Sequence, residues 1–336
     1  MKQGFDEAFG IRGGFIDNEN HYFLHAAGFH DLYDGDKQVF HRGQYFPDLM
    51  SDRALAFISR NRARPFFLYY AINLPHHPEQ SLAQYRERFR ELPEPRRTYA
   101  ATVATTDHYI GLLLRQLDIL QLTENTIVVF MSDNGHSPED YKINVDHHPS
   151  GYLQGHDYGA RGGAGYTGRW SGAKASFLEG GIRVPAILSY PAKVPKGVVR
   201  DQPITAMDWF PTVLDLCGLK PQVGVTLDGH SVMPVVADAS APSRHGVMHW
   251  AWQGRWAVRD GDWKLLFNDR GVVGGPPFDK IHLALLADAQ PEVTNHAAAR
   301  PELVARLTQL HETWERSVTP AEFRTPAPGA SGEKKK

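Results

Sequence analysis

The spacing of apolar residues predicts alternating strands and helices over the first two thirds of the chain. Residues 66–73 and 126–132 are short apolar runs, which are typical of strands covered on both faces of a parallel sheet. Between them, residues 97–120 carry apolar side chains at helical spacing, as do residues 47–61. Residues 184–190 form a third apolar run. The order strand, helix, strand predicts a right-handed crossover, so we expect an α/β fold with a mostly parallel sheet flanked by helices.

The pattern changes after about residue 240. The stretch HWAWQGRWAVRDGDWKLLF is aromatic and alternating and is interrupted at Asp260-Gly261, which predicts an antiparallel hairpin. Residues 301–316 are amphipathic and begin with a proline, a common first residue of helices. The last residues contain few hydrophobic side chains, which favours disorder. These changes predict three regions: an α/β domain at 1–238, a smaller C-terminal antiparallel sheet plus helix at 239–320, and a disordered tail at 321–336.

Composition narrows the classes of partner. The 36 Lys and Arg residues nearly balance the 38 Asp and Glu residues, which argues against nucleic acid or a membrane surface as a partner of the whole chain. No apolar run approaches transmembrane length, and the first residues lack the apolar core of a signal peptide. Cys217 is the single cysteine, so an intrachain disulfide is excluded. Because Cys217 lies in an apolar helical segment, we expect a buried thiol.

Candidate chemistry follows the ends of the predicted strands. The run 126–132 leads into Asp133 and Asn134, and ligands bind at the carboxyl ends of strands in α/β sheets. Carboxylate and amide oxygens suit Ca²⁺ or Mg²⁺. Lys174 follows in a small-residue context before a Gly-Gly turn, and a hard cation beside a lysine is suited to a phosphate or sulfate ester. The irregular stretch 136–173, in which no element is readable, is expected to form a wall of the substrate pocket.

The histidines His76 and His77 follow the run 66–73. We expect His76 to be functional because it comes directly after a strand end. The alternative is a surface turn with two idle histidines, and we place His77 behind His76 as a functional candidate.

Three motifs together resemble the sulfatases of the alkaline-phosphatase-like superfamily. They are SDNG, GAKASFLEGGIRVP and PFFLYYAINLPHHP, and they occur with GFDEAFG near the start and AVRDGDWKLLF near the end. The resemblance therefore covers nearly the whole chain. It implies an alkaline-phosphatase-like sheet, truncated because the N-terminal portion of the family pattern is missing.

The resemblance also implies roles for individual residues. Asp133 and Asn134 would be metal ligands, usually to Ca²⁺ in this family, with Mg²⁺ as the alternative. Lys174 would hold the sulfate group and the leaving oxygen, and His76 would contact the sulfate or protonate the leaving group. His77 occupies a variable position. Glu179 and Arg183 would support Lys174 without contacting the substrate.

The family's nucleophile is a formylglycine made from a cysteine or serine in a C/S-x-P-x-R context. In the family pattern this motif and paired aspartates precede the stretch that GFDEAFG resembles. We expect C/S-x-P-x-R to be absent from this chain. Cys217 does not supply the motif, because the sequence around it does not match. The chain alone is therefore expected to be catalytically inactive. Removing a first strand should also leave a sheet edge and apolar surface uncovered.

The resemblance favours a sulfuric ester hydrolase acting on a small-molecule or carbohydrate sulfate ester, in the periplasm or outside the cell. Two alternatives stay open. One is a phosphoryl hydrolase or transferase of the same superfamily, for which His147, His148, His156 and Asp157 would be additional metal ligands. The other is a non-catalytic protein that binds sulfate esters.

Overall fold

A computed structural model describes residues 4–25, 28–155, 157–161, 164–269 and 278–318. The chain divides into two compact units. Unit 1 comprises Met1–Thr126 and Ser137–Gly165, and unit 2 comprises Ile127–His136 and Tyr166–Lys336. The domain boundary predicted at residue 238 stays a prediction, and unit 2 contains residues on both sides of it. The predicted tail, 321–336, lies outside the described residues.

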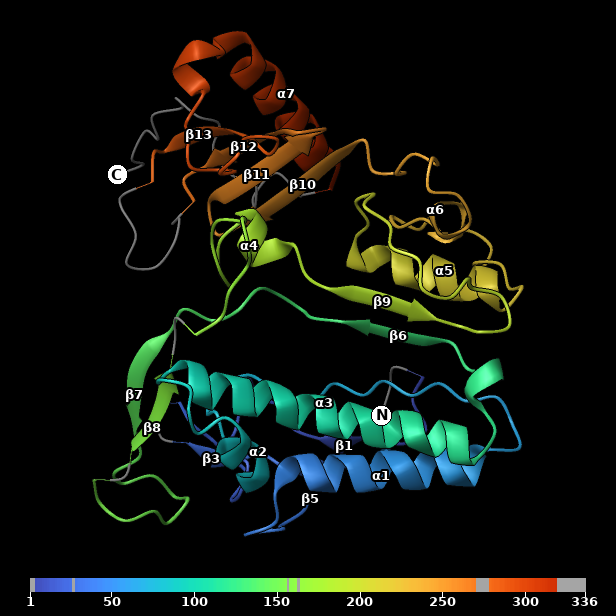
Figure 1. Ribbon diagram of the computed structural model, residues 1–336, viewed down its shortest axis with the longest axis vertical. Coiled ribbons are helices and arrows are strands. Elements are labelled where there is room, and N and C mark those ends of the chain that lie inside the picture. Colours follow the sequence, from blue (N-terminus) through green and yellow to red (C-terminus); the bar gives the residue numbers. More distant parts are fainter. Residues whose placement is uncertain (1–3, 26–27, 156, 162–163, 270–277, 319–336) are drawn as a thin grey trace. The chain divides into compact units, whose positions relative to one another are not determined.

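Unit 1 is built around two long helices that run side by side (Figure 1). They confirm the helices predicted at 47–61 and 97–120. Buried Tyr109 of the second helix donates a hydrogen bond to Asp48 of the first, with an O–O distance of 2.6 Å. The helical elements of unit 1 are α1 (Phe46–Asn61), α2 (Ala83–Arg88), α3 (Arg96–Ile119) and the 3-10 turn η1 (Thr123–Asn125).

Unit 1 also contains short antiparallel strands, which form one three-stranded sheet and two pairs among the described residues. They are β1 (Phe9–Gly10), β2 (Tyr22–Phe23), β3 (Phe29–His30), β4 (Tyr33–Asp34), β5 (Lys37–Gln38), β7 (Asp140–Asn144) and β8 (Asp157–Arg161). The prediction that 136–173 has no element of its own is therefore wrong, since β7 and β8 pair within it. Ile143 and Val145, two residues apart, share one face and are buried against Phe15 and Leu24.

The run 66–73 does not form the predicted strand, because no described strand pairs with it. Two of its aromatic side chains are instead exposed to solvent: Phe67 is 68% exposed and Tyr69 is 72% exposed. An extended segment becomes a strand only when a neighbour accepts and donates its backbone hydrogen bonds. These two side chains are apolar surface that the described residues leave uncovered.

In unit 2 the predicted strands 126–132 and 184–190 form β6 (Val128–Met131) and β9 (Ala186–Ser189). They pair antiparallel, with Val128 opposite Ser189 and Met131 opposite Ala186 (Figure 1). All pairs between described strands are antiparallel, so the mostly parallel arrangement is not formed within them. Helical elements here are α4 (Glu179–Ile182), η2 (Ala206–Asp208), α5 (Trp209–Leu216) and α6 (Met233–Ala237).

The expectation for Cys217 is wrong. The thiol is exposed, because Cys217 caps the C-terminus of α5 and does not lie on its packed face. Leu216, one residue earlier, is the side chain that packs against Tyr190 and Val194.

The C-terminal part of unit 2 confirms the predicted antiparallel sheet and helix. The sheet order is β10-β11-β12-β13, and α7 packs against it (Figure 1). The turn predicted at Asp260-Gly261 joins β11 and β12, and a core that includes Trp256 and Leu307 lies between sheet and helix. The elements are β10 (Val247–Trp252), β11 (Arg255–Asp260), β12 (Trp263–Phe267), β13 (Ile281–Leu285), η3 (Ala297–Ala299) and α7 (Pro301–Val318). Among the helices described, none combines the length and apolar character needed to cross a membrane.

Candidate functional site

The turn that follows β6 carries Asp133 and Asn134 and is fixed by backbone hydrogen bonds. The Ser132 amide donates to the Pro185 carbonyl at 3.3 Å, and the Ser132 hydroxyl donates to the Asn134 carbonyl at 2.9 Å. The Gly135 amide donates to the Gly181 carbonyl at 2.9 Å. These contacts hold the Asp133 side chain exposed and Asn134 half-buried.

Gly135 is needed where it stands because the backbone of α4 lies against it. A Cβ at this position would be 1.9 Å from the Gly180 carbonyl oxygen and 3.1 Å from the Gly181 Cα. Both neighbours are backbone atoms, so neither can rotate away. The SDNG and EGG motifs, which are more than forty residues apart in the sequence, are therefore in direct contact.

Lys174 lies beside the same turn. Its amide donates to the His136 carbonyl at 2.9 Å, directly after Gly135. Its side chain is half-buried, and burial lowers the pKa of the neighbouring His136. The structure thus brings Asp133, Asn134 and Lys174 to one region of unit 2, as the sequence predicted.

A buried ion cluster anchors the start of α4. The Lys264 ammonium, from β12, donates to Glu179 Oε1 and to Glu292 Oε1, both at 2.9 Å. The Glu179 amide donates to both Glu292 oxygens, at 2.9 and 3.1 Å. Arg259 and Arg183 each lie 3.4 Å from Glu179 Oε2. These contacts agree with the structural role expected of Glu179 and Arg183.

The pKa values of the two carboxyl groups in this cluster are shifted in opposite directions. Burial favours the neutral acid in both. For Glu179, the charges of Lys264, Arg259 and Arg183 outweigh burial and the pKa is lowered. For Glu292, burial outweighs Lys264 and the pKa is raised. Neither Lys264 nor Glu292 stands out in the sequence, because a lysine in WKLLF is read as the polar side of a strand.

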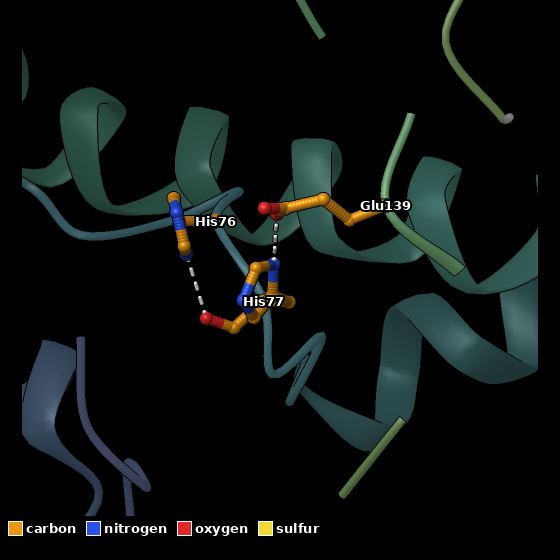
Figure 2. Close-up of side chains that lie close together, drawn as sticks. All are labelled: His76, His77 and Glu139. Atoms are coloured by element: carbon orange, nitrogen blue, oxygen red, sulfur yellow. Dashed lines mark hydrogen bonds and ion pairs between the residues drawn. The ribbon is translucent and has the colours of Figure 1, made fainter. Parts of the chain in front are cut away.

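His76 belongs to unit 1, whereas Asp133, Asn134 and Lys174 belong to unit 2. The His76 Nδ1 lies 2.8 Å from the His77 carbonyl oxygen, and the His76 ring packs against those of Phe15 and His77 at centroid distances of 5.2 and 4.2 Å. Figure 2 shows Glu139 next to the two histidines. Glu139 was not identified as a candidate from the sequence, because this residue lies in a stretch where no secondary-structure element could be predicted.

The alternative of two idle surface histidines is wrong for His77. This side chain is only 3% exposed, and its Nδ1 lies 3.3 Å from Glu139 Oε2 (Figure 2). A buried imidazole beside a carboxylate is held in place by that partner.

The chain does contain one S-x-P-x-R string, Ser240 to Arg244, so the expectation that this pattern is absent is wrong. The string follows SDNG in the sequence, whereas the family pattern places the motif before it. Ser240 lies in the exposed loop between α6 and β10, where its hydroxyl donates to Asp238 at 2.8 and 2.9 Å. Cys217 does not match the pattern, as expected.

The turn after β6 fits part of a hard-cation site. Asp133 supplies a carboxylate and Asn134 an amide oxygen, and Ca²⁺ takes six to eight such ligands while Mg²⁺ takes six. Two side chains are an incomplete set, so a cation here would need further ligands.

The mixed α/β fold is that of the alkaline-phosphatase-like class, as its solved structural neighbours show. Within this class, a sequence model of the family described as Sulfatase matches residues 2–219. The chain belongs to the sulfatase family.

Individual relatives agree with this assignment. Arylsulfatase J of Mus musculus is 27% identical over 275 residues, covering 78% of this chain and 42% of the relative. N-acetylgalactosamine-6-sulfatase of Canis lupus familiaris is 33% identical over 193 residues, covering 57% of this chain and 32% of the relative. The chain therefore spans less than half the length of these curated relatives.

Solved structures show the same fold. The crystal structure of Ps i-CgsB in complex with k-i-k-neocarrahexaose matches with a TM-score of 0.71 and 26% identity, covering 93% of this chain and 67% of that one. The structure of BT4656 in complex with D-glucosamine-2-N,6-O-disulfate matches with a TM-score of 0.61 and 17% identity, covering 96% and 78%.

Proposed function

We propose that this chain supplies cation-binding and sulfate-binding groups of a sulfuric ester hydrolase. The observation that carries the proposal is the contact between the SDNG turn and α4, which holds Asp133, Asn134 and Lys174 in one region of a sulfatase-family chain. Asp133 and Asn134 are proposed as ligands of Ca²⁺, with Mg²⁺ as the alternative.

The proposed chemistry is stabilisation of negative charge. As the S–O bond of a sulfate ester breaks, charge moves to the bridging oxygen, and the Lys174 ammonium is proposed to stabilise it there. A bound divalent cation would add electrostatic stabilisation of the sulfate oxygens. His76 is proposed as the group that gives a proton to the leaving oxygen. Its Nδ1 is engaged by the His77 carbonyl, so the proton would pass through Nε2.

Carbohydrate sulfate esters are the proposed substrate class. One relative is an N-acetylgalactosamine-6-sulfatase, and the crystal structure of Ps i-CgsB contains neocarrahexaose. We further propose that the chain acts in the periplasm or outside the cell, as its membership of the sulfatase family suggests.

The 336-residue chain alone tests whether these residues include a working nucleophile. We expect no turnover of 4-nitrophenyl sulfate above the rate in buffer, because the one S-x-P-x-R string lies in an exposed loop after SDNG. Mass spectrometry of the peptide containing Ser240 should show unmodified serine. Turnover by the isolated chain, or a formylglycine at Ser240, would contradict this part of the proposal.

Lys174→Ala tests the sulfate-binding role. In a protein that carries a relative's nucleophile-bearing segment ahead of Met1, we expect kcat for an aryl sulfate to fall about 10²- to 10³-fold, the usual effect of removing one preorganised charge stabiliser. The circular dichroism spectrum should be unchanged. Lys220→Ala, at an exposed lysine of the same unit, is the matched control and should retain the parent rate. Equal rates for both variants would remove Lys174 from the site.

A further inference from the structure

Three side chains of unit 1 have the chemistry and placement of a second, nitrogen-rich metal site. His76, His77 and Glu139 each offer one ligand atom, and these atoms all lie within 4.8 Å of one another (Figure 2). They come from two parts of the chain, the PHHP segment and the stretch that follows SDNG. No other such group of three or more is found among the described residues.

The His76 ring is oriented as metal-binding histidines usually are. Nδ1 lies 2.8 Å from the His77 carbonyl oxygen, and with Nδ1–H donating there, Nε2 is the nitrogen that carries the lone pair. Metal-ligating histidines commonly donate their other N–H to a backbone carbonyl in this way. The Phe15 ring packs against both imidazoles, edge-on to His77 at 4.7 Å and tilted on His76 at 5.2 Å, which limits their rotation.

The carboxylate is oriented as well. Glu139 Oε2 accepts a hydrogen bond from the Ser137 hydroxyl at 2.8 Å and lies 3.3 Å from His77 Nδ1. Ligands bonded to tetrahedral Zn²⁺ at about 2.0–2.2 Å lie roughly 3.3–3.6 Å from one another. The His77–Glu139 pair already has this separation, and the other pairs lie within 4.8 Å, so they have to approach by at most about 1.5 Å.

We propose that His76, His77 and Glu139 bind a transition-metal dication such as Zn²⁺, leaving a fourth position open. Two imidazoles and one carboxylate suit Zn²⁺, whereas Ca²⁺ takes oxygen ligands only. The site therefore differs in its chemistry from the Asp133 and Asn134 turn. If His76 donates the proton in the proposed sulfatase reaction, on which this consequence rests, the bound metal occupies His76 and inhibits turnover.

The binding test uses the metal-stripped 336-residue chain, titrated calorimetrically with Zn²⁺ and, separately, with Ca²⁺. Glu139→Gln keeps the side-chain shape but removes the anionic ligand, and we expect it to weaken one Zn²⁺ site at least about tenfold while leaving Ca²⁺ binding unchanged. Glu91→Gln makes the same chemical change at an exposed glutamate of unit 1 and should bind Zn²⁺ like the parent. Co²⁺ added to the parent chain should give the visible absorption of a tetrahedral site.

Equal Zn²⁺ affinity in Glu139→Gln and Glu91→Gln would overturn the proposal, as would the lack of any Zn²⁺ site in the parent. An activity assay on the protein with a nucleophile-bearing segment separates the two proposals. Zn²⁺ should inhibit the parent and Glu91→Gln at concentrations that leave Glu139→Gln uninhibited. Binding without inhibition would support the metal site and contradict the role of His76 in proton transfer.

Discussion

Replacing Lys264 by methionine is expected to destabilise unit 2 by about 3–5 kcal/mol, as found when one partner of a buried ion pair is removed. Lys264 has no exposed surface, and its ammonium lies 2.9 Å from both Glu179 Oε1 and Glu292 Oε1. Methionine fills a similar volume without charge, so the loss comes from two buried carboxylates that no longer share a cation. Chemical denaturation at pH 7, followed by tryptophan fluorescence, measures it.

The pH dependence of this loss gives a second readout. The folded-state pKa of Glu179 is lowered by Lys264, Arg259 and Arg183 against the effect of burial, and that of Glu292 is raised by burial. Removing Lys264 raises both folded-state pKa values, so in the range where these carboxyl groups titrate the folded variant binds more protons than the folded parent. Its stability relative to the parent therefore falls as pH rises from about 4.5, the range in which a free glutamate loses its proton.

The matched control is Lys220→Met, at an exposed lysine of the same unit, which should change stability by less than about 0.5 kcal/mol. A second variant, Lys264→Met combined with Glu292→Gln, should recover part of the loss, because one of the two stranded carboxylates becomes neutral. A Lys264→Met chain as stable as Lys220→Met at pH 7 would show that the cluster contributes nothing to the fold.

Local periodicity predicted the elements whose packing is decided within one segment. The helices α1 and α3, the β11–β12 hairpin and α7 all agree with apolar spacing and turn chemistry that can be read along the chain. The prediction of a strand at 66–73 was wrong because a strand needs a neighbour that pairs with its backbone, and apolar composition does not supply one. The β7–β8 pair was missed because its register depends on burying Ile143 against Phe15, more than a hundred residues earlier.

The sequence predicts those residues of the candidate site that lie in recognisable motifs. Asp133 and Lys174 could be proposed because SDNG and GAK mark a strand end and a small-residue turn. Lys264 and Glu139 were missed for a physical reason: their partners, Glu179 and His77, are 85 and 62 residues away, and no local pattern records such a pairing. Buried polar groups are recognised from their partners, and partners are known only from the fold.

Gly135→Ala is expected to separate the SDNG turn from α4, at a cost of about 3 kcal/mol or more. The added Cβ would lie 1.9 Å from the Gly180 carbonyl oxygen and 2.9 Å from its carbon, so one of the two backbones has to move. Moving either one breaks the hydrogen bond from the residue 135 amide to the Gly181 carbonyl and loosens the one from Lys174 to His136. Denaturant unfolding gives the energy, and hydrogen exchange at the amides of residues 135 and 174 reports the two bonds.

The control for this substitution is Gly246→Ala, since a Cβ at Gly246 meets no atom within 4 Å and its backbone needs no left-handed conformation. Both variants add the same methyl group to unit 2, so unfolded-state effects largely cancel in the comparison. Faster exchange at residues 135 and 174 in Gly135→Ala alone would show that α4 holds Asp133, Asn134 and Lys174 together. If both variants have the same stability and exchange rates, the turn keeps its geometry without α4, and Lys264 and Glu179 then have no part in positioning these groups.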